Sequence, residues 1–257
     1  MKKMFLLSRK RLAVLGCALA AIAMFWAVNS PLVVGASATQ RQLPIYCVQR
    51  DQKMVAISFD AAWGNEDTQQ LIDILAKYNI KATFFVVGDW VDKYPESVKA
   101  LSDAGHEVMN HSNHHDHFSK LSRDQIIADV NACNDKIETV TGVRPTLIRP
   151  PYGEYDDNVI TAIRAAGMEP IQWDVDSLDW KDLSAAEITK RVTTKVQAGS
   201  IVLFHNAAKH TPEALPTILE TLLQEGYTFV PISEIILPGE YNVDYTIDHT
   251  GRQCPAG

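Results

Sequence analysis

Short apolar runs alternate with longer amphipathic segments along most of the chain, from Met54 to Val230. Runs rich in Val, Ile and Phe are typical of buried strands, and apolar residues spaced three and four apart are typical of helices. The pattern predicts strands at 54–59, 82–87, 107–109, 146–148, 168–173, 200–204 and 227–230. It predicts helices at 66–78, 95–104, 122–140, 156–166, 185–197 and 212–225.

Residues with capping chemistry stand where several of these helices are expected to begin. Ser122 with Gln125, and Ser184 with Glu187, have the spacing of a capping box, in which each side chain bonds the other residue's backbone N–H. Thr211 is expected to cap the helix that follows it. The limits predicted for these helices therefore rest on capping residues as well as on the spacing of apolar residues.

The alternation of strands and helices predicts a parallel sheet covered by helices. An open doubly wound sheet and a closed barrel both satisfy it. No Gly-rich phosphate loop follows the first predicted strand, which disfavours a nucleotide-binding sheet. No internal repeat divides the region, so we expect one domain over residues 53–236, with a lead-in at 39–52 and a tail at 237–257.

Residues 1–38 differ in composition from the rest of the chain. A positively charged start is followed by the apolar run Leu12–Val28 and by small residues at Val34–Ala38. This order predicts a secretory signal cut after Ala38. An uncut membrane anchor is the second interpretation, although the run is at the short limit for a spanning helix; lipidation at Cys17 is a weaker third. In each case the domain is expected to work outside the cytoplasmic membrane.

The overall composition narrows the class of partner. The chain has 257 residues, of which 46% are hydrophobic and 21% charged, and its net charge is −7. This length supports one large core. The acidic balance, without a basic stripe in the body of the chain, argues against a nucleic-acid partner. The cysteines left after cleavage are odd in number and have no zinc-binding spacing, although Cys47 and Cys254 could pair. We expect a monomer.

Histidines concentrate in one short stretch of the chain. Four of the eight lie between His111 and His117, just after a predicted strand. Packing explains such a cluster poorly, and neutral imidazole is a common ligand of zinc-like metals. His111 and His115, four residues apart, can converge on one ion. The alternative is a solvated polar loop.

Other ionisable side chains also follow the predicted strands. The carboxyl ends of barrel strands form the active-site face. The groups found at these ends are Asp60, His111 with His115, Arg149, Asp174 to Asp179 with Trp180, and His205. Each alone has a simpler explanation, as a helix cap, a surface ion pair, a turn former or a core histidine. Together they contain a base, a Lewis-acid site and a proton donor, which metal-assisted hydrolysis requires.

In this order the residues resemble the five motifs of the polysaccharide deacetylases, the group typified by the chitooligosaccharide deacetylase (NodB) homology domain. The matching motifs are Asp60, His111-x-x-x-His115, Arg149-Pro150-Pro151-Tyr152, Asp176-x-x-Asp179-Trp180 and Leu203-x-His205. The surrounding sequence is similar to that of sporulation-associated deacetylases of Gram-positive spore formers. The resemblance implies an α/β fold, a distorted seven-stranded (β/α) barrel. It also implies a divalent metal and removal of acetyl groups from N-acetylated amino sugars in chitin-like or peptidoglycan glycans.

The resemblance implies a base and a metal site on one side of the active site. Asp60 is implied to be the general base that takes a proton from water, and Arg149 to orient it. His111 and His115 are implied to bind the metal. Nitrogen and oxygen ligands suit Zn, with Co or Ni as alternatives.

It implies a general acid on the other side. His205 would protonate the leaving amine, and Asp179, or alternatively Asp176, would hold and charge it. The residues implied to stabilise the oxyanion and to shape the acetyl pocket are Tyr152, through its backbone N–H, and Trp180 and Leu203.

One position departs from the family pattern. The first motif usually has two adjacent aspartates, the second a metal ligand, and here the pair is Asp60 and Ala61. Two histidines alone bind zinc more weakly than the three protein ligands of an ordinary catalytic site. The residues considered as substitutes are Asp60 itself, Asn65, Asp67 and Asp116, besides water. A noncatalytic glycan-binding or structural protein of the spore envelope is the alternative function, but the retained acid and base favour an enzyme.

Overall fold

The computed structural model describes residues 18–26 and 41–257. Residues 18–26 form a short exposed helix, and the rest of the predicted signal, with its cleavage position, lies outside the described residues. In the described ranges no helix is long and apolar enough to cross a membrane. Residues Gln42–Gly257 form one compact unit, which contains all the predicted site residues.

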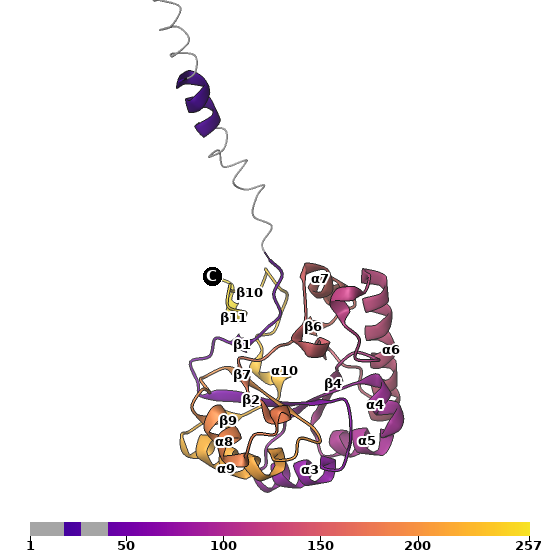
Figure 1. Ribbon diagram of the computed structural model, residues 1–257. Helices are drawn as coiled ribbons and strands as arrows, with labels where there is room; N and C mark the ends of the chain where they lie inside the picture. Colours follow the sequence, from indigo (N-terminus) through magenta and orange to yellow (C-terminus); the bar gives the residue numbers. More distant parts are fainter. Residues whose placement is uncertain (1–17, 27–40) are drawn as a thin grey trace, which may run out of the picture. The chain divides into compact units, whose positions relative to one another are not determined.

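Within residues 41–257, eleven strands form one sheet (Figure 1). The strands are β1 (Cys47–Val48), β2 (Met54–Ala61), β3 (Thr83–Val86), β4 (Glu107–Asn110), β5 (Leu147–Ile148), β6 (Glu169–Pro170), β7 (Val175–Asp176), β8 (Ser200–His205), β9 (Thr228–Phe229), β10 (Tyr245–Ile247) and β11 (Arg252–Pro255). Their order is β10-β11-β1-β8-β2-β3-β4-β5-β6, with β7 beside β8 and β9 beside β2. Strands β2 to β6 pair in parallel, as β8 does with β2.

Helices surround this sheet (Figure 1). They are α3 (Thr68–Lys77), α4 (Gly88–Lys93), α5 (Pro95–Asp103), α6 (Arg123–Thr141), α7 (Asp157–Ala165), α8 (Ala185–Thr193), α9 (Thr211–Gln224) and α10 (Ile232–Ile235). Both predicted capping boxes are confirmed, at the starts of α6 and α8. The short helices α4 and α10 were not predicted. Thr211 was predicted to be a cap, and this is wrong: it is the first residue of α9, and its hydroxyl donates elsewhere, to Asp179.

The sheet curls because one irregular strand pairs on two sides. Of the predicted fifth strand, 168–173, only β6 forms, paired with β5, and a second short strand, β7, follows that range and pairs with β8. Between them, Ile171 forms a bridge with Ile45, just before β1. The ring of pairings therefore runs from β2 through β3, β4, β5 and the β6–β7 segment to β8 and back to β2. The predicted distorted (β/α) barrel is confirmed.

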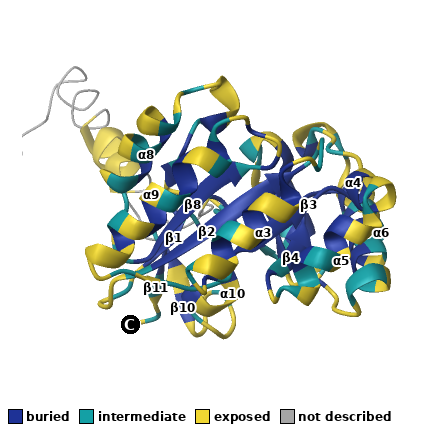
Figure 2. Cartoon of the chain, turned by 90° about the horizontal axis from the view of Figure 1, so that it is seen from below, coloured by how far each residue is buried: buried dark blue, intermediate teal, exposed yellow. Residues whose placement is uncertain are grey.

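Side chains of β2 show how the barrel separates its core from its site. Val55, Ile57 and Phe59 pack against the helices, and Phe59 stacks on Phe84 with ring centroids 4.8 Å apart. The alternate side chains face the barrel interior, because successive residues of a strand point to opposite faces. Figure 2 shows the consequence: the central strands are buried while the outer turns of the helices are exposed. Asp60 ends the interior-facing row, where the barrel opens.

Both ends of the domain join the sheet. β1, in the predicted lead-in, pairs in parallel with β11 and antiparallel with β8. In the predicted tail, β10 pairs antiparallel with β11. The side chain of Gln253, which is fully buried, both accepts from and donates to the backbone of Leu237. Cys47 and Cys254 lie in these strands as free thiols.

Candidate active site

One pocket of about 400 Å³ collects the strand-end residues. The predicted residues that line it are Asp60, His111, His115, Tyr152, Trp180, Leu203 and His205. Arg149 and Asp179 are 0% and 2% exposed and lie behind the wall, bonded to Asp60 and His205. Asp60 and His205 are register partners on β2 and β8, so both side chains point into the barrel.

Asp60 is held in its charged form by a buried guanidinium. Arg149 Nη1 donates to Asp60 Oδ1 at 2.7 Å, and Nη2 donates to the carbonyl oxygen of Gln172 at 3.1 Å. The guanidinium carbon also lies 4.3 Å from the ring centroid of Phe85. Burial by itself would raise the pKa of Asp60, but neighbouring positive charge, that of Arg149 first, outweighs burial and lowers it. Asp60 is therefore an ionised carboxylate. Its Oδ1 bonds Arg149, and its Oδ2 does not face Arg149.

The histidine loop is held by polar side chains around it. Ser112 accepts from the backbone N–H of His115 at 3.0 Å, and its own N–H donates to Asn110 Oδ1 at 2.7 Å. The Ser112 hydroxyl donates to Asp129 of α6 at 3.3 Å. These contacts hold His115 at a φ of +57°, a left-handed conformation that is unfavourable for residues other than glycine.

His111 and His115 offer a divalent metal two nitrogen ligands. The carbonyl oxygen of Arg149 accepts from His111 Nδ1 at 2.7 Å, which leaves the lone pair on Nε2, 3.5 Å from Asp60 Oδ2. Burial lowers the pKa of His115 to about 4, so its imidazole is neutral at pH 7. Among the described residues, no group of three His, Cys, Asp or Glu side chains could hold a metal. The donor set therefore fits the metal in part and lacks its third protein ligand.

The residues considered as substitutes for the missing aspartate are, apart from Asp60, directed away from the pocket. Asp116 is exposed, Asn65 donates to a serine of α5, and Asp67 accepts from the backbone of the loop after β8. None of these three lines the pocket. Ala61 is 1% exposed and packs with the apolar residues on the helix side of β2.

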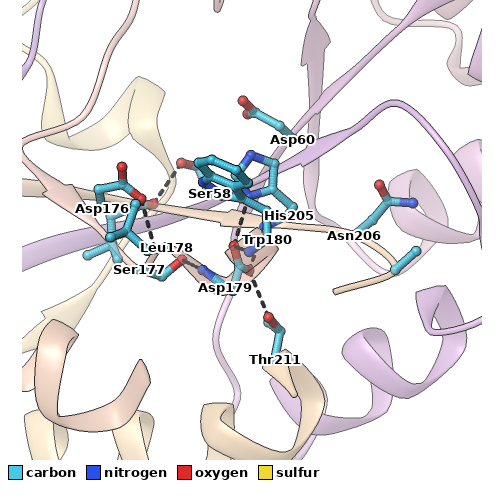
Figure 3. A network of polar contacts seen from close by, with 12 residues as sticks. Ser58, Asp60, Asp176, Ser177, Leu178, Asp179, Trp180, His205, Asn206 and Thr211 are labelled. Carbon is cyan, nitrogen blue, oxygen red and sulfur yellow. Dashed lines mark hydrogen bonds and ion pairs between the residues drawn. The ribbon is translucent and has the colours of Figure 1, made fainter. Parts of the chain in front are cut away.

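His205 is bonded to a buried carboxylate that is itself fully engaged (Figure 3). Asp179 Oδ1 accepts from His205 Nδ1 at 2.8 Å and from the backbone N–H of Trp180 at 2.9 Å. Asp179 Oδ2 accepts from the backbone N–H of His205 at 2.8 Å and from the Thr211 hydroxyl at 2.7 Å. Burial would lower the pKa of His205, but the bond to Asp179 and the charges of nearby carboxylates outweigh it and raise it.

The other fifth-strand aspartates have different surroundings. Asp176 lines the pocket and accepts from the backbone N–H of Leu178 at 2.9 Å. Asp174 accepts from the Ser200 hydroxyl at 2.7 Å and ties the β6–β7 segment to β8. Of the two aspartates that the sequence left open as the partner of His205, Asp179 makes the bond.

Comparison with known proteins identifies the family to which this fold belongs. Residues 48–171 match the family model described as polysaccharide deacetylase. The crystal structure of BA3943, described as a CE4 family pseudoenzyme from Bacillus anthracis, superposes with a TM-score of 0.72 at 36% identity, covering 75% of this chain and 68% of that one. The chain belongs to the polysaccharide deacetylase family. A BA3943 mutant described as having restored enzymatic activity is 38% identical, with a TM-score of 0.72 over 75% of this chain and 70% of that one.

Curated relatives of the polysaccharide deacetylase family share the domain but are longer proteins. The peptidoglycan-N-acetylmuramic acid deacetylase PdaC of Bacillus subtilis is 36% identical over 73% of this chain and 40% of its own length. The peptidoglycan-N-acetylglucosamine deacetylase PgdA of Listeria monocytogenes is 37% identical over 72% of this chain and 39% of its own length. The chain thus spans about two fifths of each of these relatives.

The remaining family-motif residues form the mouth of the pocket. Tyr152 has a φ of +59° and is followed by Gly153, whose φ is +67°. A side chain at Gly153 would meet the ring of Trp173 at 2.9 Å, so this turn requires glycine. The turn leaves the Tyr152 side chain 57% exposed at the rim of the pocket. The Trp180 side chain, also at the rim, is exposed to the same extent. Leu203, 2% exposed, forms part of the pocket wall.

Two residues near this site were not predicted from the sequence. Asn206 follows His205 directly, and its side chain donates to the carbonyl oxygens of Trp63 and Gly64 at 2.8 and 2.7 Å. Trp63 lines the pocket. Both lie within three residues of a motif residue, but neither is ionisable, so the pattern of ionisable strand ends does not indicate them.

Proposed function

We propose that this protein hydrolyses the N-acetyl groups of amino sugars in a cell-wall glycan. The observation that carries the proposal is the pairing of two differently charged proton-transfer groups in one pocket: Asp60 with its pKa lowered and His205 with its pKa raised. Side chains whose environments push their pKa values apart are suited to serve as base and acid. PdaC and PgdA, named as peptidoglycan deacetylases, support the substrate class.

In this proposal the chain's own residues divide the proton transfers. Asp60 Oδ2 accepts a proton from the attacking water, while Arg149 keeps the carboxylate oriented and ionised. His205, protonated and held by Asp179 through Nδ1, donates from Nε2 to the nitrogen of the leaving amine. Tyr152 offers its backbone N–H to the developing oxyanion, and Trp180 with Leu203 encloses the acetyl methyl group.

His111 and His115 are the residues that would hold a divalent metal, Zn, Co or Ni. When bound, such an ion would polarise the acetyl carbonyl and lower the pKa of the attacking water. Because Ala61 supplies no ligand, we propose that the metal is bound weakly. The relatives' peptidoglycan substrates and the predicted export signal support action outside the cytoplasmic membrane, at the cell wall.

A noncatalytic glycan-binding role is the second candidate. Ala61 and the similarity to BA3943, which is described as a pseudoenzyme, favour it. Retention of the whole His205–Asp179–Thr211 chain argues against it, since glycan binding needs no proton donor.

The deciding experiment is acetate release from peptidoglycan and from chitooligosaccharides, with metal removed by chelation and then restored as Zn or Co. Deacetylation predicts acetate that disappears on chelation and returns with added metal. The His205→Ala variant is the matched control for contaminating activity. Glycan that binds without acetate release at any metal concentration would favour the second candidate.

A further inference from the structure

The exposed aromatic side chains of residues 41–257 gather at one place. Trp63, Tyr152 and Trp180 are 56%, 57% and 57% exposed, and all three line the pocket. In this part of the chain the other large hydrophobic side chains with high exposure are aliphatic and lie elsewhere: Val143, Leu223 and Val243. Exposed aromatic surface gathered around a cleft is typical of a ligand-binding site.

Three of the pocket's rings continue into a row along one wall. The rings of Trp63 and His115 meet edge to face with centroids 6.1 Å apart. His115 contacts Tyr152 at 4.5 Å, and Tyr152 stacks on His117 at 4.2 Å and 15°. The contacts therefore join Trp63 to His117 through His115 and Tyr152 in one continuous row of rings.

Trp63 is kept exposed by a rigid backbone. Asn206, which is 3% exposed, donates to the carbonyl oxygens of Trp63 and Gly64 and accepts from the N–H of Ala62 at 3.3 Å. Trp90 Nε1 also donates to Gly64 at 2.6 Å. The loop after β2 is thus fixed to the loop after β8. Such fixation reduces the entropy lost when a ligand orders the side chain.

We infer that Trp63 forms a sugar-binding subsite next to the reacting sugar, with Asn206 as its positioning residue. Pyranose rings present apolar C–H faces, and N-acetylglucosamine units carry no charge, so flat aromatic contact is the chemistry suited to them. The inference rests on the proposed function because it takes a glycan to be the ligand of the pocket. It goes beyond that function in requiring that at least two consecutive sugars bind, whether or not acetyl is removed.

The test is calorimetric titration of the full chain with N-acetylglucosamine and its di- and tetrasaccharides. Wild type should bind the tetrasaccharide more tightly than the monosaccharide. Trp63→Ala should lose roughly 10-fold in tetrasaccharide affinity, with monosaccharide binding unchanged. Trp63→Phe should keep most of the affinity, and Leu223→Ala, which removes an exposed side chain of α9, should behave as wild type.

Asn206→Leu separates positioning from general damage, because it removes the two donated bonds, keeps a similar side-chain size and adds no charge at this buried position. It should weaken tetrasaccharide binding in the wild-type background and have no further effect in a Trp63→Ala background. Equal losses in both backgrounds, or a loss of monosaccharide binding, would overturn the positioning role.

Parallel acetate measurements keep this inference separate from the proposed function. Length-dependent binding that Trp63→Ala abolishes, without acetate release from wild type, would sustain the subsite and reject deacetylation. Acetate release by the wild type, together with undiminished tetrasaccharide binding by Trp63→Ala, would sustain deacetylation and reject the subsite. Failure of the wild type to bind any of the three sugars would also overturn the subsite.

Discussion

The two sides of the pocket differ in how completely they are built. On the acid side, formed by His205, Asp179 and Thr211, both oxygens of the buried carboxylate accept hydrogen bonds, and the imidazole is aimed at the pocket. On the metal side, formed by His111, His115 and Ala61, the carbonyl oxygen of Arg149 orients the His111 imidazole, but the residues that the structure describes supply no third ligand.

In the proposed function, proton donation by His205 and binding of a metal would therefore rest on separate parts of the fold. The acid side depends on residues of β8, α9 and the segment after β7, whereas the metal side depends on β2 and the loop after β4. A change at the end of β2 can therefore weaken the metal side and leave the acid side intact. Asp60, which faces His111 and is the register partner of His205, lies between the two sides.

The strongest test of the acid side is His205→Ala. If the wild type deacetylates, turnover should fall by about 10²–10⁴-fold, because a positioned proton donor contributes that much. Substrate affinity should stay near the wild-type value, since the donor acts in the transition state. Steady-state kinetics on a chitooligosaccharide measures both quantities. Turnover equal to wild type would make His205 a structural residue only.

Asp60 can be separated from its buried partner by Arg149→Met. Removal of one member of a buried ion pair leaves an uncompensated charge and costs about 3–5 kcal/mol of unfolding free energy. Urea unfolding measures the loss. Arg144→Met is the matched control, because Arg144 pairs with Asp135 and Glu138 at the exposed surface, where such pairs contribute about 0–1 kcal/mol. Similar losses in both variants would contradict the buried-pair argument.

The metal side can be completed by Ala61→Asp. Wild type should carry less than one metal ion per chain after purification, and the variant should bind zinc about 10-fold more tightly or better, since it regains a protein ligand. Elemental analysis measures the occupancy. Ala61 packs among apolar residues, so the variant should also be less stable without zinc and gain more thermal stability when zinc is added.

Ala62→Asp is the control for added negative charge, and it should gain less zinc affinity than Ala61→Asp. Full metal occupancy in the wild-type protein would contradict the weak-site prediction and would indicate that Asp60 has taken the vacant position. Acetate release by Ala61→Asp but not by wild type would identify the missing ligand as the cause of inactivity.

The part of the site that could be predicted from the sequence consists of residues that stand directly at the ends of strands. Asp60, Arg149 and His205 stand at strand ends, and parallel strands bring such ends to one mouth, so periodicity alone indicated their grouping. The capping boxes at Ser122 and Ser184 were predictable because they depend on residues three apart.

What the sequence did not predict depends on contacts between distant segments. The fifth strand divides because its two ends have different neighbours, β5 and β8. Strands β1 and β11 are only two and four residues long, too short for a periodic signal, and β1 pairs both with β11 and with β8. Thr211 resembles a helix cap locally, but the buried carboxylate of Asp179, 32 residues earlier in the chain, accepts from its hydroxyl.

The smallest expected effect concerns the pH dependence of the acid side. The pKa of His205 is raised, so its protonated form persists above the ordinary histidine pKa and is lost as pH rises through the raised value. Activity should therefore fall on the alkaline side of the profile.

Asp176 is the least of the carboxylates that raise the pKa of His205, and Asp176→Asn removes its charge while keeping an oxygen for the backbone N–H of Leu178. The alkaline limb of kcat/KM should move to lower pH by a fraction of a unit, and less at high salt, because charge interactions across solvent are screened. A limb that moves to higher pH would reverse the sign of the argument. A loss of turnover as large as that of His205→Ala would show that Asp176, and not Asp179 alone, holds the acid in place.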